Sequence, residues 1–190
     1  ILNEKEFWSR NFYVNKNALI PRPETELMVD KLTKIFRGKA INILDIGTGS
    51  GCILLSLLIE LKNSYGQGID ISKNAIKVAR YNAKKYNLIN RAKFLKTCFS
   101  NINHKKFDLV VSNPPYIRRS AIKNLDGCIK LFEPKVALDG GNDGLDLIRK
   151  VIYKAKYILK IKGLLALEIG NEQLNKVSKI LKRNNLRVEH

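Results

Sequence analysis

The chain has 190 residues, which is long enough for one compact domain with a sizeable core and excludes a mini-protein. Hydrophobic residues make up 45% and charged residues 27% of it, so bulk disorder is excluded as well. The longest apolar stretch, residues 52–61, contains Ser56 and Glu60 and is too short to cross a bilayer. The three cysteines form no CxxC pair, so we expect neither a disulfide framework nor a zinc site, and a reducing compartment.

The net charge of +18 is well beyond the magnitude of about 2 to 8 that serves solubility in a small domain. Such a charge attracts polyanions, which predicts a weak contact with RNA or the ribosome. A lysine-rich coding bias explains the same charge without any partner, and the chain contains no long basic run that would favour the first explanation. The termini contain no signal peptide or sorting motif, so we expect a cytoplasmic protein without a membrane partner.

The first 22 residues are aromatic-rich and are predicted to be an irregular entrance segment. Pro21 and Pro23 hold the backbone extended at its end. A helix is predicted from there to about residue 36, with acidic residues in its first turn and Gly38 available to end it.

Strands and helices alternate from residue 41 onward. Strands are predicted at residues 41–46, 65–71, 92–97, 107–112 and 164–169, and helices at residues 52–62, 73–86, 145–159 and 172–183. Ser72 is the predicted N-cap of the second of these helices. This alternation indicates an α/β fold with a doubly wound, Rossmann-like, mostly parallel sheet covered on both faces. We expect a single domain over residues 1–190, with residues 1–22 as the entrance segment and residues 23–190 as this core. The last residues, 186–190, are typical of the start of a further strand.

A glycine-rich loop follows the first predicted strand of the sheet, over residues 45–51. Its glycines have the spacing G-x-G-x-G, because Cys52 stands where a dinucleotide-binding fingerprint requires glycine. The loop resembles that of class I methyltransferases, which bind S-adenosylmethionine. Asp45 and Asp70 stand at the ends of two successive strands, and Asp70 is placed to accept hydrogen bonds from ribose hydroxyls.

The most specific local feature is the segment after the strand at residues 107–112, namely Asn113, Pro114, Pro115 and Tyr116. The prolines lack N–H donors and fix the loop, while the Asn113 amide can both donate and accept. Such a loop suits a planar nitrogen, as in an amide or an exocyclic amine. We expect the Asn113 Oδ1 and the Pro114 carbonyl to accept hydrogen bonds from the N–H groups of this nitrogen. Catalysis is then mainly proximity and orientation, which can supply about 7 to 11 kcal/mol of the barrier.

Four segments together resemble the HemK/PrmC family of peptide chain release factor N5-glutamine methyltransferases, and they contain all five prolines of the chain. In chain order they are residues 20–26, 45–51, 113–116 and 132–145. The resemblance implies a class I S-adenosylmethionine-dependent methyltransferase fold. It also implies methyl transfer to the side-chain amide nitrogen of the glutamine in the Gly-Gly-Gln motif of release factors.

The resemblance also assigns roles to residues by position. The implied cofactor-binding residues are Gly47, Thr48, Gly49, Ser50, Gly51, Asp70, Cys98 and Asn113. The implied glutamine slot is Asn113 through Tyr116, with Asn113, Pro114 and Tyr116 as catalytic residues. Thr97 stands where the family usually has an acidic residue facing the adenine amino group, which predicts weaker cofactor affinity.

Two other readings of the sequence stay open. A nucleic-acid methyltransferase acting on an exocyclic amine meets the same planar nitrogen with a similar loop, and the positive charge favours it. A cofactor-binding or RNA-binding scaffold with a degenerate site is the non-enzymatic alternative. The resemblance further predicts that the chain is a catalytic-domain fragment, without the helical N-terminal domain and last strands of the family, and we expect it to be a monomer.

Overall fold

The computed structural model describes residues 3–103, 106–127 and 133–188. Parts of the features treated above lie outside these ranges, namely Cys128, residue 132 of the segment 132–145, and residues 189–190 of the last expected strand. The strands are β1 (Glu4–Phe7), β2 (Arg10–Tyr13), β3 (Asn42–Ile46), β4 (Tyr65–Asp70), β5 (Ala92–Lys96), β6 (Phe107–Ser112) and β7 (Leu159–Leu167). The α-helices are α1 (Glu26–Ile35), α2 (Cys52–Glu60), α3 (Lys73–Lys85), α5 (Asp146–Ile158) and α6 (Leu174–Arg183).

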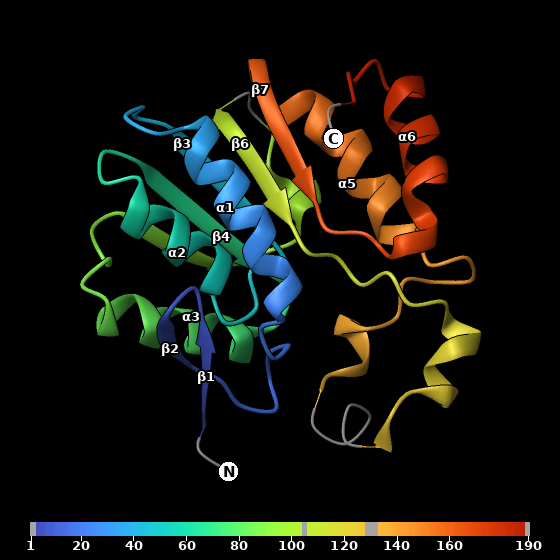
Figure 1. The fold of residues 1–190 in the computed structure, drawn as a ribbon, viewed down its shortest axis with the longest axis horizontal. Helices are drawn as coiled ribbons and strands as arrows, with labels where there is room; N and C mark the ends of the chain where they lie inside the picture. The colour runs from blue at the N-terminus through green and yellow to red at the C-terminus, as the bar shows by residue number, and fades with distance from the viewer. Residues whose placement is uncertain (1–2, 104–105, 128–132, 189–190) are drawn as a thin grey trace.

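Five strands form one parallel sheet in the order β5-β4-β3-β6-β7 (Figure 1). From β3 the chain proceeds outward through β4 to β5, and it then returns to the other side of β3 to add β6 and β7. The strand order therefore reverses between β3 and β6. At such a switch point the loops after the two strands diverge and leave a crevice at the carboxyl edge. The predicted doubly wound parallel sheet is confirmed.

The core lies on both faces of this sheet because successive side chains of a strand point to opposite faces. Ile43 of β3 packs into a cluster with residues of α1, α2 and α3. Leu44, the next residue, packs into a second cluster with α5. Helix α6 covers α5 through Ile148, Ile152 and Val177. Both faces of the sheet are therefore covered, as predicted.

The helices begin and end close to the predicted residues. Ser72 is the N-cap of α3, since its Oγ accepts a hydrogen bond from the Ala75 N–H at 3.2 Å. Helix α2 is buried from Cys52 to Leu58, because α1 and α3 flank it on either side. Within the described part of the chain, no helix is both long enough and apolar enough to span a membrane.

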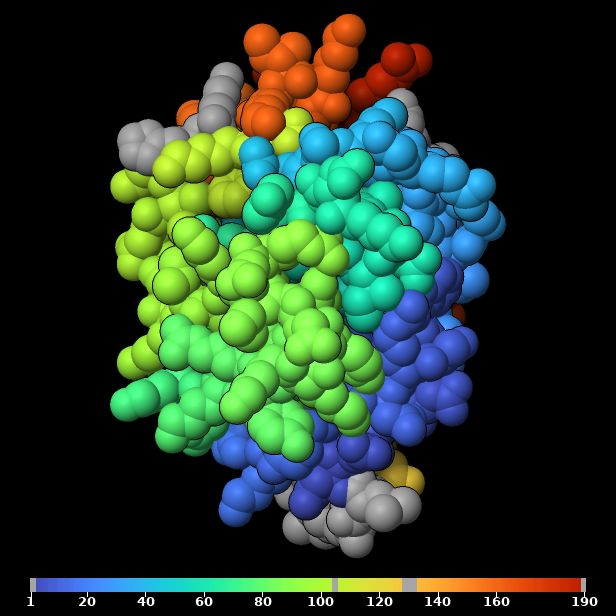
Figure 2. Space-filling model, turned by 90° about the vertical axis from the view of Figure 1, so that its left-hand side faces the viewer, coloured from blue at the N-terminus to red at the C-terminus, as the bar shows by residue number. Residues whose placement is uncertain are grey.

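The N-terminal segment differs from the prediction of an irregular entrance. β1 and β2 form an antiparallel hairpin, with Trp8 and Ser9 as turn residues at φ angles of 53° and 54°. Tight hairpins usually place Asn-Gly or a similar pair there, and the absence of that signal explains why the sequence did not predict the hairpin. Phe7 and Phe12 are fully buried in the core. On the surface, the N-terminal segment in blue borders the green segment around residues 80–100 (Figure 2).

The last strand and the chain after α6 also differ from the prediction. β7 begins at Leu159 rather than at residue 164, and its pairing with β6 is irregular between Leu159 and Leu164. Lys162 has a φ of 64° in this stretch, as in a bulge, and the bulge hides the period-two pattern. Residues 186–188 form no strand, and Leu186 packs instead against the cluster of α5 and α6.

We predict that Phe12→Ala lowers the free energy of unfolding by about 3 to 5 kcal/mol, because it removes a buried ring from the core. Urea denaturation followed by circular dichroism measures the change. Leu27→Ala is the control, since the Leu27 side chain is 68% exposed, and it should change the free energy by less than about 0.5 kcal/mol. Equal effects of the two substitutions would contradict the assignment of the hairpin to the core.

Candidate functional site

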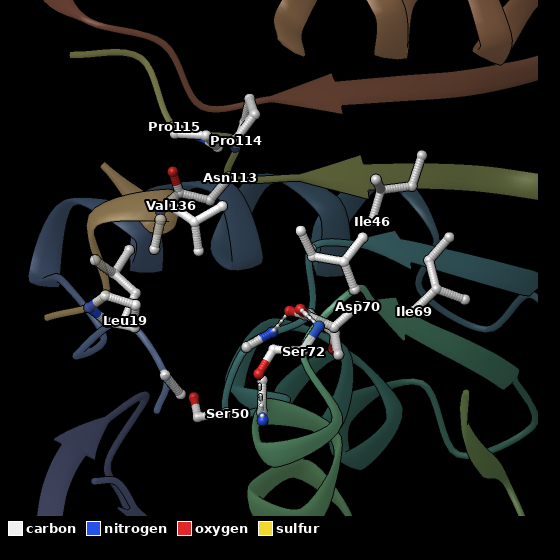
Figure 3. Close-up of a pocket in the computed structure, with 18 of the residues that line it drawn as sticks. Leu19, Ile46, Ser50, Ile69, Asp70, Ser72, Asn113, Pro114, Pro115 and Val136 are labelled. Carbon is white, nitrogen blue, oxygen red and sulfur yellow. Dashed lines mark hydrogen bonds between the residues drawn. The ribbon is translucent and has the colours of Figure 1, made fainter. Parts of the chain in front are cut away.

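A cavity of about 390 Å³ lies at the carboxyl edge of the sheet, where the strand order reverses (Figure 3). Its lining comes mainly from the segment before α1, the glycine loop after β3, the ends of β4 and β5, and the loop after β6, and it is completed by residues of α2, of α5 and of the segment 134–137. Residues of these parts that line it include Arg22, Thr25, Gly47, Thr48, Gly49, Ser50, Asp70, Thr97, Cys98, Asn113, Pro114 and Pro115. Most of the predicted site residues therefore surround one cavity.

The glycine loop presents open backbone to this cavity. Gly47 and Gly49 have φ angles of 72° and 55°, and a Cβ at either position would meet no atom closer than 3.9 Å. The Gly47 and Thr48 N–H groups donate to the Ile69 carbonyl at 2.9 and 3.0 Å, which ties the loop to the end of β4. Gly51 differs, because its Cβ would lie 3.2 Å from Ala79 and Phe94 in the core. Gly51 is thus a packing residue at the start of α2 and does not line the cavity.

Asp70 is held at the rim of the cavity by two backbone groups. Its Oδ2 accepts from the Gly49 N–H at 3.1 Å and its Oδ1 from the Ser72 N–H at 2.8 Å. A carboxylate has about four acceptor positions, so further donors such as hydroxyls can still bind to it. Asp70 and Asn113 lie across the cavity from each other (Figure 3).

Asp45 lies beneath the glycine loop and is fully buried. Its Oδ2 accepts a hydrogen bond from the Thr48 hydroxyl at 2.7 Å. Burial raises the pKa of Asp45 to about 7, the hydrogen bond from Thr48 offsets part of this rise, and the nearby Asp70 carboxylate adds to it. The role of Asp45 in the structure is therefore to hold Thr48 and the loop from below.

One end of the cavity is lined by apolar side chains. Ile69 and Ile71 at the end of β4 line it, together with Phe99 and Leu147. Ile71 is 58% exposed, which leaves an apolar surface available for a planar ring. Cys98 lies here too, and hydrogen bonding with Ser100 lowers the pKa of its thiol. Thr97 lines the same end, where its hydroxyl accepts from the Asn101 amide at 3.3 Å.

On the opposite side, Asn113 belongs to a chain of hydrogen bonds. Its Nδ2 donates to the Thr25 Oγ1 at 3.3 Å, and the Thr25 hydroxyl donates to the Glu168 Oε2 at 2.6 Å. Thr25 is 3% exposed, so this contact is shielded from water. Burial raises the pKa of Glu168, while the hydrogen bonds from Thr25 and Asn113 offset part of that rise.

The loop after Asn113 is held from outside by residues 138–144. The Ile117 N–H donates to the Leu138 carbonyl at 3.2 Å, and the Gly140 N–H donates to the Ile117 carbonyl at 2.8 Å. A Cβ at Gly144 would lie 2.4 Å from the Tyr116 carbonyl oxygen, so only glycine allows this approach. Residues 138–144 thus pack against the loop and hold it in place.

Tyr116 itself is turned away from the lining of the cavity. Its ring packs against the cluster formed by α5 and α6, and its carbonyl accepts from the Gln173 Nε2 at 3.0 Å. Burial raises the pKa of its hydroxyl. A direct role for Tyr116 in substrate binding stays a prediction, whereas its packing role is visible in the structure.

Arg22 joins two separate walls of the cavity. Its Nη2 lies 2.7 and 2.9 Å from the two carboxylate oxygens of Glu133, a residue that is only 5% exposed. Burial raises the pKa of Glu133, and the Arg22 guanidinium opposes the rise. The segment before α1 is thereby tied to the segment that precedes residues 138–144.

Four residues with a clear place in the site were missed as site residues in the sequence analysis, namely Arg22, Thr25, Glu133 and Glu168. Their partners are 88 to 143 residues distant along the chain, and no local pattern indicates such pairings. One usable signal was present. Glu168 is an acidic residue at the end of a predicted strand of a parallel sheet, where polar residues gather around ligands.

The cavity fits a nucleoside linked to an amino acid. The open backbone at Gly47 and Gly49 leaves room for a chain to approach, the Asp70 carboxylate accepts from hydroxyls, and the apolar end with Ile71 suits a planar base.

Comparison with known proteins agrees with this fit. The methyltransferase small domain family matches residues 23–130. A release factor glutamine methyltransferase of Caulobacter vibrioides is 44% identical over 96% of this chain and 64% of its own length. One from Buchnera aphidicola is 42% identical over 97% and 66%. A bifunctional methyltransferase of Rickettsia prowazekii is 40% identical over 95% of this chain and 39% of its own length.

The chain thus spans between about two fifths and two thirds of the length of these relatives.

Among solved structures, a methyltransferase from Pyrococcus furiosus aligns with a TM-score of 0.68 and 18% identity, covering 93% of this chain and 78% of its own. A ribosomal protein L11 methylase from Lactobacillus delbrueckii aligns with a TM-score of 0.67 and 19% identity, covering 90% and 73%. Both support the class I methyltransferase fold.

The raised pKa of Asp45 makes the free energy of unfolding depend on pH. Its pKa is about 7 in the folded chain and ordinarily 3.8, so between these values the folded state binds more protons than the unfolded state. Stability from this group therefore falls as pH rises from about 4 to about 7, by an amount on the order of a few kcal/mol.

Asp45→Asn cannot ionise, so the difference in unfolding free energy between variant and parent should shift in favour of the variant from pH 5 to pH 8. Urea midpoints at several pH values measure it, and the contributions of other acids cancel in the difference. A difference that stays constant with pH would show that Asp45 has an ordinary pKa.

The chain belongs to the methyltransferase small domain family, and its resemblance to the release factor glutamine methyltransferases of the HemK/PrmC family is confirmed.

Proposed function

We propose that this chain methylates the side-chain amide nitrogen, N5, of the glutamine in the Gly-Gly-Gln motif of release factors, with S-adenosylmethionine as methyl donor. The observation that carries the proposal is the position of Asn113 and Pro114 on the same cavity as the open glycine loop. A carboxamide bound there lies beside the group that the loop holds. The names of the relatives from Caulobacter and Buchnera support the same substrate.

The cofactor would be held by backbone and carboxylate groups of the first two strand ends. We assign its amino acid part to the loop of Gly47, Thr48, Gly49 and Ser50, and its ribose hydroxyls to Asp70. The apolar end with Ile71, Cys98 and Phe99 would cover the adenine ring. When bound, this cofactor supplies a methyl group on a positively charged sulfur.

The substrate nitrogen is a poor nucleophile because its lone pair is delocalised into the amide. Asn113 Oδ1 and the Pro114 carbonyl would accept hydrogen bonds from its two N–H groups. These hydrogen bonds would orient the nitrogen and increase its electron density. The new N–C bond would form as the S–C bond breaks, with the electron pair of the broken bond left on the sulfur, and the nitrogen would then lose one proton to water. The residues contribute mainly orientation, which can supply about 7 to 11 kcal/mol of the barrier.

The proposed substrate also bears on the location and the partners of the chain. Release factors act in translation, so we place the chain in the cytoplasm, and we propose that it works there as a monomer. We also propose that the net charge of +18 gives a weak, salt-dependent affinity for RNA or the ribosome.

We predict that labelled S-adenosylmethionine, incubated with the protein, a release factor and bulk nucleic acid, labels the Gly-Gly-Gln glutamine. Mass spectrometry of the digested factor locates the label. Asn113→Ala should lower the rate at least about 100-fold because the amide loses its orienting acceptor. The control is Asn42→Ala, an exposed residue at the start of β3 and therefore at the opposite edge of the sheet. Label found only in nucleic acid would favour an exocyclic-amine methyltransferase instead.

We predict that Asp70→Ala weakens cofactor binding by about 1 to 3 kcal/mol, because buried hydroxyl donors of the ribose lose their acceptor. Isothermal calorimetry with S-adenosylhomocysteine measures the dissociation constant without any methyl transfer. Asp30→Ala is the matched control, since that carboxylate pairs only locally with Lys34 on the exposed side of α1, at 2.6 Å. An unchanged affinity of Asp70→Ala would remove Asp70 from the cofactor site.

A further inference from the structure

An asparagine side chain has two different ends, and only one of them suits the proposed reaction. The Oδ1 end accepts hydrogen bonds and the Nδ2 end only donates them. A substrate amide that presents N–H groups needs the acceptor. If the Asn113 carboxamide were turned by half a rotation about its Cβ–Cγ bond, its NH₂ group would point at the N–H groups of the substrate, and no hydrogen bond could form.

The hydrogen bonds of Thr25 distinguish the Oδ1 end of Asn113 from the Nδ2 end. The Thr25 hydroxyl has one hydrogen, and it donates that hydrogen to the Glu168 carboxylate at 2.6 Å. A carboxylate is acceptor-only, so this direction is fixed while Glu168 is charged. The Thr25 oxygen can then only accept from Asn113, and the amide group 3.3 Å from it has to be the donating NH₂.

The sheet register brings the outer members of this chain together. Asn113 directly follows β6 and Glu168 directly follows β7, and the two strands pair up to Ser112 and Leu167. The Glu168 N–H also donates to the Ser112 carbonyl at 3.1 Å. Thr25 approaches from the N-terminal side of α1, where Pro23 begins the short 3-10 helix that ends at Thr25.

Water has little access to the middle of the chain of hydrogen bonds. Thr25 is 3% exposed, so no bulk water competes for its hydroxyl. Glu168 does not line the cavity, whereas Thr25 and Asn113 do, so Glu168 acts on the cavity only through Thr25 and Asn113. Glu168 is partly buried, and the hydrogen bonds that its carboxylate accepts reduce the cost of removing that charge from water.

We propose that Thr25 and Glu168 are positioning residues, which hold the Asn113 carboxamide with Nδ2 inward and thereby leave Oδ1 for the substrate amide. The inference rests on the proposed methylation of a carboxamide nitrogen. It goes beyond that proposal because it assigns functions to two residues that do not touch the reacting atoms.

The first test compares Thr25→Val with Thr25→Ser. Valine has the shape of threonine but neither donates nor accepts, whereas serine keeps the hydroxyl and loses only a methyl group. We expect Thr25→Val to lower the turnover of release factor methylation about 10- to 100-fold at saturating substrate and cofactor. Thr25→Ser should keep most of the turnover. Both variants should bind S-adenosylhomocysteine with the affinity of the parent, because Asp70 and the glycine loop are unchanged.

The second test reads the orientation of Asn113 without any reaction. In the NMR spectrum of the ligand-free protein, the two Nδ2 hydrogens of Asn113 should show nuclear Overhauser contacts to the Thr25 methyl group. Glu168→Gln gives Thr25 a neutral partner that can also donate, so the Asn113 amide should lose its single orientation and its side-chain NH₂ signals should broaden or double.

The outcomes separate the two proposals. Failure of the parent to label glutamine would overturn the proposed function, and the inferred purpose of the oriented amide with it. If the parent labels glutamine while Thr25→Val turns over as fast as the parent, the positioning inference is overturned alone. Nuclear Overhauser contacts that place Oδ1 rather than Nδ2 against Thr25 would overturn it as well, whatever the turnover.

Discussion

One buried hydrogen bond fixes the geometry on which the site depends. The Ser112 hydroxyl at the end of β6 donates to the Ile46 carbonyl at the end of β3, at 2.7 Å, and Ser112 is 1% exposed. It ties together the two strands between which the strand order reverses. The loops that leave these strands therefore start side by side and diverge around one cavity. A shift in the pairing of β3 with β6 would separate Asn113 from the glycine loop.

The two sides of the cavity are built by different polar clusters. On the side of β3 and β4, Asp45 holds Thr48 from below, and Asp70 accepts from the Gly49 N–H. On the side of β6 and β7, Glu168 holds Thr25, which accepts from Asn113. In both clusters a partly or fully buried carboxylate with a raised pKa binds a threonine hydroxyl, and that threonine lies at the cavity.

Most of the sheet could be predicted from the sequence, because buried parallel strands alternate with amphipathic helices and each period is visible locally. The hairpin of β1 and β2 could not, because Trp8 and Ser9 are unusual residues for a turn with positive φ angles. The early start of β7 was hidden by its bulge. In the hairpin, tertiary packing, namely the burial of Phe7 and Phe12, decides a conformation that local preferences do not favour.

The site, like the fold, could be predicted from the sequence only in part. Gly47, Gly49, Asp70 and Asn113 follow strand ends, and the topology alone predicts that they meet. Gly51 belongs to the same glycine pattern, yet the contacts with Ala79 and Phe94 show that its small size serves the packing of α2. A motif therefore does not distinguish glycines that leave room for a ligand from glycines that leave room for the core. Only the surroundings of each Cβ make that distinction.

The separation of the two clusters has a consequence for how the site responds to change. The Asp45 and Asp70 cluster shares no hydrogen bond with the Thr25 and Glu168 cluster in the described residues, and Ser112 joins the two sides through its hydroxyl and the Ile46 carbonyl, which belong to neither cluster. Substitutions at sites without shared partners have more nearly additive effects than substitutions within one hydrogen-bond network. Binding on the glycine-loop side and orientation on the Asn113 side are therefore expected to vary independently. A chain with weakened contacts at Thr97 could then bind its cofactor less tightly and still present the Asn113 acceptor in the same orientation.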